Sequence, residues 1–256
     1  MMLKVLRHDG RPETAPHYDL FEIDAEPGMT VLGALFRARE VYDDSLAFRY
    51  SCRGAVCGSC AMLVNRYPAL ACRTQVAGLL AGEEREPLAP YPAIEGGEAW
   101  DARTTVLVEP LPHLPVLRDL VVDMAPFFAH YRAMRPTFAP ADRAPERERL
   151  MAPETAGALE AYTACLLCGA CYGACPVDGD DPAYAGPAAL AKVYRFHLDS
   201  REAGDGRRLR TADTPHGWWR CEFHANCRRV CPRGIEPNVA IGRARAELTR
   251  RKKGGE

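Results

Sequence analysis

The chain has 256 residues, of which 26% are charged, and its formal net charge at pH 7 is -1. This length is enough for two domains of ordinary size, each with a core of its own. The balanced charge provides no overall basic field of the kind that nucleic-acid-binding proteins use. We therefore expect no nucleic-acid partner.

The N-terminal segment carries charged residues and lacks the apolar stretch and small-residue cleavage site of a secretory signal. The long uncharged stretch at 161–177 is short for a membrane span and contains cysteine, glycine and proline. We expect the chain to stay in the cytoplasm, where cysteines are more often metal ligands than disulfides.

The first predicted elements form a β-hairpin. Residues 3–7 and 18–23 have strand character, and Asp9-Gly10-Arg11-Pro12 between them supplies turn residues. Thr30 then precedes apolar residues at helical spacing and is expected to cap a helix.

A second pair of strands is predicted at 61–64 and 69–72, with a turn at 65–68, and a further strand at 105–108. The order is therefore strand, strand, helix, cysteine-rich loop, strand pair and closing strand. This is the order found in β-grasp ferredoxins.

After Pro110 the sequence favours helices separated by proline-rich joints. We place two domains at 1–108 and 109–256. Apolar residues on all sides of segment 115–128 predict a helix at the domain junction, and segment 136–153 is expected to be a surface connector. Further helices are predicted at 154–162 and 187–198 and after Pro237, because proline is favoured at the first position of a helix.

Four of the eleven cysteines lie in the first half with the spacing C-x4-C-x2-C-x11-C, which is the plant-type spacing for a 2Fe-2S cluster. Small residues such as Gly54 and Gly58 allow tight turns in this loop, and backbone amides there can hydrogen-bond to cluster sulfur. A zinc site is the alternative, although zinc ligands usually occur as two C-x2-C pairs. The predicted ligands are Cys52, Cys57, Cys60 and Cys72.

The second half contains the run C-x2-C-x2-C-x3-C-P, which is typical of bacterial two-cluster ferredoxins. In those proteins the fourth cysteine of the run binds the other cluster, so Cys175 should not join its neighbours. A partial second run ends in Cys231-Pro232 and supplies the missing ligand. The predicted 4Fe-4S ligands are Cys165, Cys168, Cys171 and Cys231.

Three cysteines, Cys175, Cys221 and Cys227, are left, and three thiolates suit a 3Fe-4S cluster. His224 stands where the partial run lacks a cysteine. Imidazole can bind iron, so His224 could complete a 4Fe-4S cluster. Alternatively it lies beside a three-iron cluster and donates a hydrogen bond or a proton.

These patterns predict an α+β protein, with an N-terminal β-grasp 2Fe-2S ferredoxin domain followed by an all-α, bacterial-ferredoxin-like domain that holds two clusters. With both cysteine groups the chain closely resembles the iron-sulfur subunit of succinate dehydrogenase and fumarate reductase. The similarity covers nearly the whole sequence. It includes the segments SCRGAVCGSC, ACRT, EPLPHLPVLRDLVVDM, GPAAL and CPRGIEP.

The resemblance implies a subunit between a flavoprotein with covalent FAD and a membrane anchor that holds quinone and could carry haem. Electrons would pass between the flavin and the 2Fe-2S, 4Fe-4S and 3Fe-4S clusters, in that order, with the last cluster facing the quinone. Dicarboxylate chemistry would belong to the flavoprotein. The expected location is the cytoplasmic side of the inner membrane, with attachment through the anchor.

Two departures from ubiquinone-linked members bear on the quinone. No tryptophan pair follows Cys175-Pro176, and Glu222 rather than histidine follows Cys221. These features look more like fumarate reductase subunits that use menaquinone. By position, the residues that resemble a quinone pocket are Glu222, Phe223, His224 and Arg245.

Trp218 and Trp219, just before Cys221, either contact quinone or simply pack around the cluster. Two functions of other classes also stay open. The chain could be an iron-sulfur carrier for a different flavoprotein without a quinone anchor, or a zinc-stabilised interaction module without a redox role.

Overall fold

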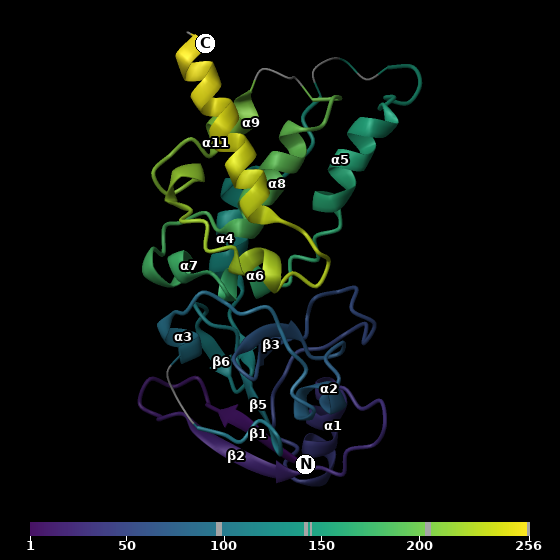
Figure 1. Cartoon of the computed structure of the whole chain (residues 1–256), viewed down its shortest axis with the longest axis vertical. Coiled ribbons are helices and arrows are strands. Elements are labelled where there is room, and N and C mark those ends of the chain that lie inside the picture. The colour runs from purple at the N-terminus through teal and green to yellow at the C-terminus, as the bar shows by residue number, and fades with distance from the viewer. Residues whose placement is uncertain (96–98, 141–142, 144, 203–205, 255–256) are drawn as a thin grey trace.

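The computed structural model describes residues 1–95, 99–140, 143, 145–202 and 206–254. The molecule is elongated, with a β-sheet unit at one end and most of the helices at the other (Figure 1). The N-terminus lies in the sheet unit, and the C-terminus lies at the far end of the last helix. The fold is therefore α+β, as predicted.

The sheet unit contains five strands in the order β2-β1-β5-β3-β4. Strand β1 runs antiparallel to β2 and parallel to β5, and β3 runs antiparallel to both β4 and β5. The predicted strands are thus confirmed. They are β1 (Met2–Arg7), β2 (His17–Glu22), β3 (Ala61–Val64), β4 (Tyr67–Leu70) and β5 (Thr105–Glu109).

Strand β4 begins two residues earlier than predicted because the β3–β4 turn is tighter. Asn65 and Arg66 both have positive φ, 48° and 61°, which is the conformation of a two-residue hairpin turn. The predicted domain boundary after residue 108 falls inside β5, one residue before its end. The exact division into domains stays a prediction.

Helix α1 (Val31–Val41) packs its apolar face on the sheet. Its predicted cap is confirmed, since the Thr30 hydroxyl accepts a hydrogen bond from the Gly33 N–H at 3.1 Å. Two short helices follow, α2 (Val76–Leu80) and α3 (Pro92–Glu95).

The predicted single helix at 115–128 is wrong. The strands β6 (Val116–Arg118) and β7 (Val121–Val122) form a small hairpin, and only then does α4 (Ala125–Ala133) begin. Leu120 packs into the core of the sheet unit, whereas Val122 packs into a second core beneath the helices. The apolar residues of this segment occur on all sides because they contact two different cores.

The remaining helices are short, apart from α5, α8 and α11. Helices α8 and α11 pack together and begin at Pro187 and Pro237, which confirms both predicted starts. Part of the predicted connector, residues 141–142 and 144, lies outside the described residues. The helices are α5 (Pro153–Thr163), α6 (Ala170–Gly173), α7 (Pro176–Asp180), α8 (Pro187–His197), α9 (Arg207–Thr211), α10 (Asn226–Arg229) and α11 (Pro237–Gly254), with a 3-10 turn at Trp218–Arg220.

In the part of the chain that the structure describes, no helix combines the length and apolar character needed to cross a membrane.

Candidate metal centres

The first cysteine loop, residues 51–60, winds so that several backbone N–H groups point at sulfur. The amides of Gly54, Val56 and Cys57 donate to the Cys52 Sγ at 3.4, 3.3 and 3.3 Å. Such a ring of N–H groups stabilises negative charge on a thiolate and its cluster. Positive φ at Arg53, 55°, makes part of this winding possible.

The β3–β4 hairpin brings the other two cysteines of this group together. Cys60 opens the entry to β3 and is 3% exposed, and Cys72 follows β4 as its neighbour. Burial raises the pKa of Cys60 to about 12. A hydrogen bond from Ser59 instead lowers the pKa of Cys57 to about 6, so this exposed part of the loop favours the thiolate.

The second group surrounds a small apolar cavity between α5, α6 and the segment before α11. Cys231 reaches it from after α10, although it lies sixty-six positions from Cys165 in the sequence. The Ile235 N–H donates to the Cys231 Sγ at 3.3 Å. The cysteines that line the cavity are Cys165, Cys168, Cys171 and Cys231.

The third group lines a separate cavity at the ends of α7 and α10. Cys175 immediately precedes α7, Cys227 lies in α10, and Cys221 follows the 3-10 turn. The Phe223 N–H donates to the Cys221 Sγ at 3.4 Å. The structure therefore brings Cys175 to the second cysteine run and Cys231 to the first, which is the crosswise grouping that the sequence predicts.

The wall of the second group's cavity suits an iron-sulfur cluster. Arg233 is the one ionisable side chain other than cysteine among the described residues that line the second group's cavity. Burial raises the pKa of Cys168 to about 11 and that of Cys227 to about 12. Soft thiols in an apolar, water-poor site are the ligands that such clusters take, and the bound metal would displace their protons.

No three His, Cys, Asp or Glu side chains in the described ranges are arranged to hold a single metal ion. The cysteines of the second and third groups stand around cavities instead of converging on a point. Binding of iron by each cysteine stays a prediction.

The four residues predicted to line a quinone pocket lie together beside the third cysteine group. Glu222, Phe223 and His224 line its cavity, and the His224 Nε2 lies 3.2 Å from a Glu222 carboxylate oxygen. Hydrogen bonds from Arg220, and then His224, lower the pKa of Glu222. Phe223 is 45% exposed, so this corner of the cavity reaches the surface.

Arg245 has a positioning role that the sequence does not indicate. Its guanidinium donates to the carbonyl oxygens of Trp218 and Cys221 at 2.6 and 2.7 Å. It also lies over the rings of Trp219 and Phe223, at 5.5 and 4.8 Å from their centroids. Arg245 therefore holds the Cys221 segment against α11.

The two tryptophans have different environments. Trp218 is fully buried and donates its indole N–H to the Leu209 carbonyl at 2.8 Å, which fits the packing alternative. Trp219 is 40% exposed and donates to Asp213 at 2.6 Å. Trp219 and Phe223 thus give the surface beside the third group an apolar character.

Two buried polar residues near the cysteines, Asp178 and Asn226, were not predicted from the sequence. Asp178 is 4% exposed, and neither of its carboxyl oxygens has a hydrogen-bond partner among the residues that the structure describes. Burial raises the pKa of Asp178 well above its usual range. Its position three residues after Cys175 is unremarkable in the sequence, whereas in the structure Gly186 lies against its carboxylate.

Asn226 connects the two halves of the molecule and was also missed. Its side chain donates to the carbonyl oxygens of Ala89 and Ala174 at 3.0 and 2.9 Å and accepts from the Ala89 N–H at 2.7 Å. Asn226 is 1% exposed and stands next to Cys227. It therefore fixes the loop before α3 to the cysteine-bearing helices.

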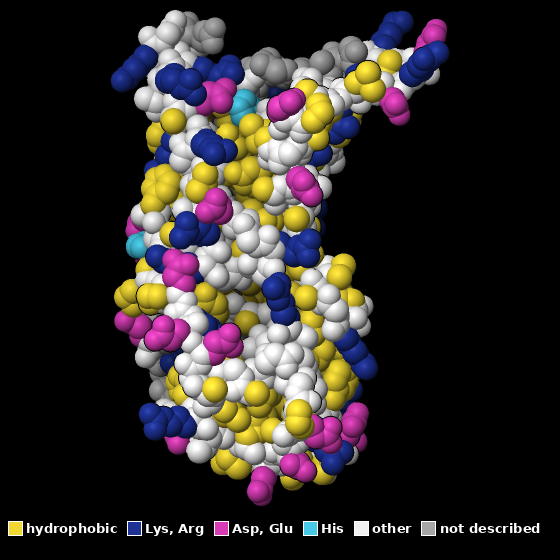
Figure 2. Space-filling model, turned by 45° about the vertical axis from the view of Figure 1, so that its right-hand side comes forward, with side chains coloured by type: hydrophobic (Ala, Val, Ile, Leu, Met, Phe, Trp, Pro, Cys, Tyr) yellow, Lys and Arg dark blue, Asp and Glu magenta, His cyan; other side chains and the backbone are white. Residues whose placement is uncertain are grey.

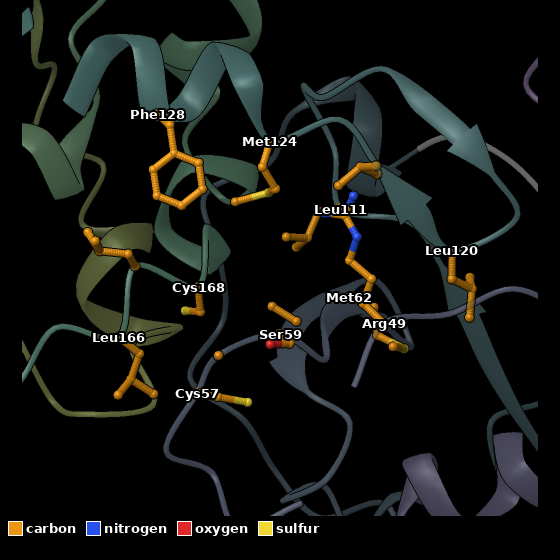
Figure 3. Close-up of a pocket in the computed structure, with 14 residues that line it drawn as sticks. Arg49, Cys57, Ser59, Met62, Leu111, Leu120, Met124, Phe128, Leu166 and Cys168 are labelled. Carbon is orange, nitrogen blue, oxygen red and sulfur yellow. The ribbon is translucent and has the colours of Figure 1, made fainter. Parts of the chain in front are cut away.

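A further cavity, of about 320 Å³ and distinct from the cavities of the second and third groups, lies between the first and second cysteine groups. Figure 3 shows Cys57 and Ser59 on the side of the sheet unit, and Met124 and Phe128 on the helical side. Cys168 points toward it from the second group. The first two cysteine groups are therefore neighbours across this junction.

Charges of both signs are interspersed over the molecular surface (Figure 2). In the basic C-terminal segment, Arg251 pairs with Glu247 at 2.8 Å and Lys252 pairs with Asp213 at 3.0 Å. These pairs within the chain offset part of the positive charge at this helix end.

Comparison with known protein families supports the fold and the cysteine groups independently. Residues 2–129 match the model of a 2Fe-2S iron-sulfur cluster binding domain, and residues 161–235 match that of a 4Fe-4S dicluster domain. The fumarate reductase iron-sulfur subunit of Escherichia coli is 31% identical over 251 residues, which cover 98% of this chain and 93% of that protein. The chain belongs to this family of fumarate reductase and succinate dehydrogenase iron-sulfur subunits.

Iron-sulfur subunits of succinate dehydrogenase and of fumarate reductase are both similar to this chain. The succinate dehydrogenase iron-sulfur subunit of Coxiella burnetii is 34% identical over the full length of both chains. The fumarate reductase iron-sulfur subunit of Mycobacterium tuberculosis is 34% identical, covering 95% of this chain and 90% of the relative. The chain is thus an electron-transfer subunit of an oxidoreductase complex that contains other subunits.

A solved structure has the same fold. A chain of the Mycobacterium smegmatis Sdh1 complex in the apo form superposes with a TM-score of 0.80 at 24% identity, covering 98% of this chain and 96% of that one.

Proposed function

We propose that this subunit relays electrons between the FAD of a flavoprotein partner and a membrane quinone through 2Fe-2S, 4Fe-4S and 3Fe-4S clusters. The observation that carries the proposal is the serial placement of the three cysteine groups. The first adjoins the second at Gly58 and Cys168, and the second adjoins the third at Cys171 and Cys227. A row of redox sites along the molecule suits conduction and not catalysis on a bound substrate.

In this proposal each cysteine group holds one cluster. The first group holds 2Fe-2S within a domain of residues 1–108, and the other two lie within residues 109–256. The proposed ligands are Cys52, Cys57, Cys60 and Cys72 for 2Fe-2S, Cys165, Cys168, Cys171 and Cys231 for 4Fe-4S, and Cys175, Cys221 and Cys227 for 3Fe-4S.

When bound, the clusters supply one-electron redox chemistry whose potentials depend on charge, burial and hydrogen bonds to sulfur. The chain supplies those conditions. N–H groups around Cys52 offset negative charge at the most exposed site, and apolar walls around Cys171 keep water from the second. At the third site, the Phe223 N–H donates to the Cys221 Sγ and offsets negative charge there.

The two ends of the row would face different partners. The sheet end would face the flavoprotein, which carries the dicarboxylate chemistry, and the third group would face a membrane anchor with its quinone. The exposed rings of Trp219 and Phe223, together with Glu222 and His224, support a quinone pocket there. The departures in the Cys175 and Cys221 segments favour menaquinone.

The test uses the complex purified with its native partners. We expect iron and acid-labile sulfide in amounts that fit three clusters, and a 3Fe-4S electron paramagnetic resonance signal in the oxidised state. Protein without iron and sulfide would overturn the cluster assignment. A third cluster that is 4Fe-4S in the wild type would favour His224 as a ligand.

Co-purification separates the proposal from the alternative carrier. A flavoprotein together with a quinone-containing anchor is the expected composition. A stable complex with a flavoprotein and no membrane component would support the carrier and contradict the quinone relay.

A further inference from the structure

A glycine lies where the loop of the first cysteine group contacts the run of the second. Gly58 stands next to Cys57 in the first loop and faces the backbone of the second cysteine run. A Cβ built on Gly58 would lie 2.7 Å from the Cβ and 3.1 Å from the Cα of Cys168, and 3.2 Å from the carbonyl oxygen of Leu166. Real Cβ atoms essentially never come as close as 2.7 Å, so a side chain here would push the two loops apart.

The backbone conformation at Gly58 also favours glycine. Its φ is +76°, in the left-handed region where residues with a Cβ are strained. The atoms that a side chain would meet belong to backbone and to the Cβ of Cys168, not to the tip of a flexible side chain. The second loop therefore could not accommodate a side chain at Gly58 without a shift of its backbone.

The protein beside this contact is not continuous. The cavity of about 320 Å³ borders Gly58 and is lined mainly by apolar side chains, among them Met62, Leu111 and Met124 (Figure 3). Electron tunnelling decays less steeply through bonded and closely packed protein atoms than across a gap between them. The Gly58–Cys168 contact is therefore a better route than one across the cavity.

We propose that Gly58 is a positioning residue that sets the separation of the 2Fe-2S and 4Fe-4S clusters, and that electrons cross between them at its contact with Cys168. The inference rests on the proposed function. In the step, one electron passes from the reduced 2Fe-2S cluster to the oxidised 4Fe-4S cluster, so that the first is oxidised and the second reduced by one electron. The same transfer can run in the opposite direction. No proton is transferred and no covalent bond is formed or broken.

The experiment compares Gly58→Ala with Gly28→Ala in the complete complex. Gly28 is matched for backbone strain, with φ +82°, but nothing lies within 4 Å of its built Cβ. For each variant we would measure iron and sulfide, the reduction potential of each cluster, and the enhancement of 2Fe-2S spin relaxation by the reduced 4Fe-4S cluster. Rapid-freeze spectroscopy would give the rate of electron transfer between the two.

We expect Gly58→Ala to retain its clusters, to lose part of the relaxation enhancement because the clusters move apart, and to transfer electrons severalfold more slowly. Gly28→Ala should match the wild type in both measurements. Unchanged relaxation and rate in Gly58→Ala, with clusters present, would overturn the inference and leave the proposed function intact.

If Gly58→Ala does not retain its first cluster, the relaxation measurement on the wild type tests the inference. Strong relaxation enhancement between its two clusters supports the close contact, and the absence of enhancement when both are reduced contradicts it. Absence of the clusters from the wild type would instead contradict the proposed function.

Discussion

Arg7 shows how a single residue organises the sheet unit. Its side chain, 9% exposed on β1, donates to Asp19 and Asp43 at 2.6 Å each and to Asp119 at 3.1 Å. A fourth hydrogen bond reaches the Ser45 hydroxyl at 2.9 Å. One guanidinium thus joins β1, β2 and two loops, which is possible because its planar donors point in several directions.

Asp43 gives this network a dependence on pH. Hydrogen bonds from the Ser45 hydroxyl, and then from Arg7, lower the pKa of Asp43 from 3.8 to about 2. A carboxyl with a lowered pKa in the folded state stabilises the fold above its ordinary pKa, and this contribution is lost as pH falls toward the folded value. We expect Asp43→Asn to be less stable than the wild type at neutral pH, with a difference that shrinks between pH 3.8 and about 2.

Denaturant unfolding at a series of pH values would measure this difference, with the exposed neighbour Asp44→Asn as the control. Cluster loss at low pH affects all three proteins and cancels in the comparison. A difference that is constant across this range would contradict the role given to the Asp43 carboxylate.

At the scale of elements, the β6–β7 hairpin is the part that differs most from the sequence prediction. Asp119, in its turn, is 3% exposed and has φ 45°. Its carboxylate accepts from the Arg7 side chain, from the His8 N–H at 3.1 Å and from the Ala47 N–H at 2.8 Å. This buried acidic side chain, together with backbone hydrogen bonds from Asp119 to His8 and from Leu120 to Ala47, fixes the hairpin to the sheet unit.

Removal of this carboxylate should be costly. Because Asp119→Ala leaves Arg7 and two backbone N–H groups short of a buried partner, we expect a loss of about 3 kcal/mol in the free energy of unfolding. Asp123→Ala is the control, since Asp123 is more accessible and accepts from the Ala125 N–H at the start of α4. Equal losses in the two variants would contradict a special role for Asp119.

At the scale of the whole molecule, the two ends depend on their clusters to different degrees. The sheet unit has a large core of its own, with Leu3, Val5 and Val106 fully buried. The helices that carry or flank the second and third cysteine groups, α6 and α10, have four residues each. Helices of this length are not stable alone, so their position depends on packing and on the metal that joins their cysteines.

We expect removal of the clusters by chelation to expose α6 and α10 while the sheet stays folded. Hydrogen exchange followed by mass spectrometry would then find faster exchange in these helices and little change in β1, β2 and β5. The sheet serves as the internal control. Similar loss of protection in both regions would contradict this separation and indicate that the two ends unfold together.

The sequence by itself determined the chemistry and the local elements. Cysteines separated by two to four intervening residues, such as Cys165 and Cys168, are held close by the backbone, so their spacing predicts a cluster loop without knowledge of the fold. The strands of the sheet, the Thr30 cap and the helices that begin at Pro187 and Pro237 also depend on nearby residues and were predicted correctly.

The tertiary structure decided which distant segments meet, apart from the crosswise grouping of the cysteines, which the two cysteine runs predict. Segment 115–128 has a composition that fits a helix, but its residues divide between two cores and form a hairpin. The buried Asp178, the Asn226 bridge and the contact of Gly58 with Cys168 likewise arise from packing between segments far apart in the chain. Such contacts depend on how all the elements fill space together, and residue spacing carries no information about them.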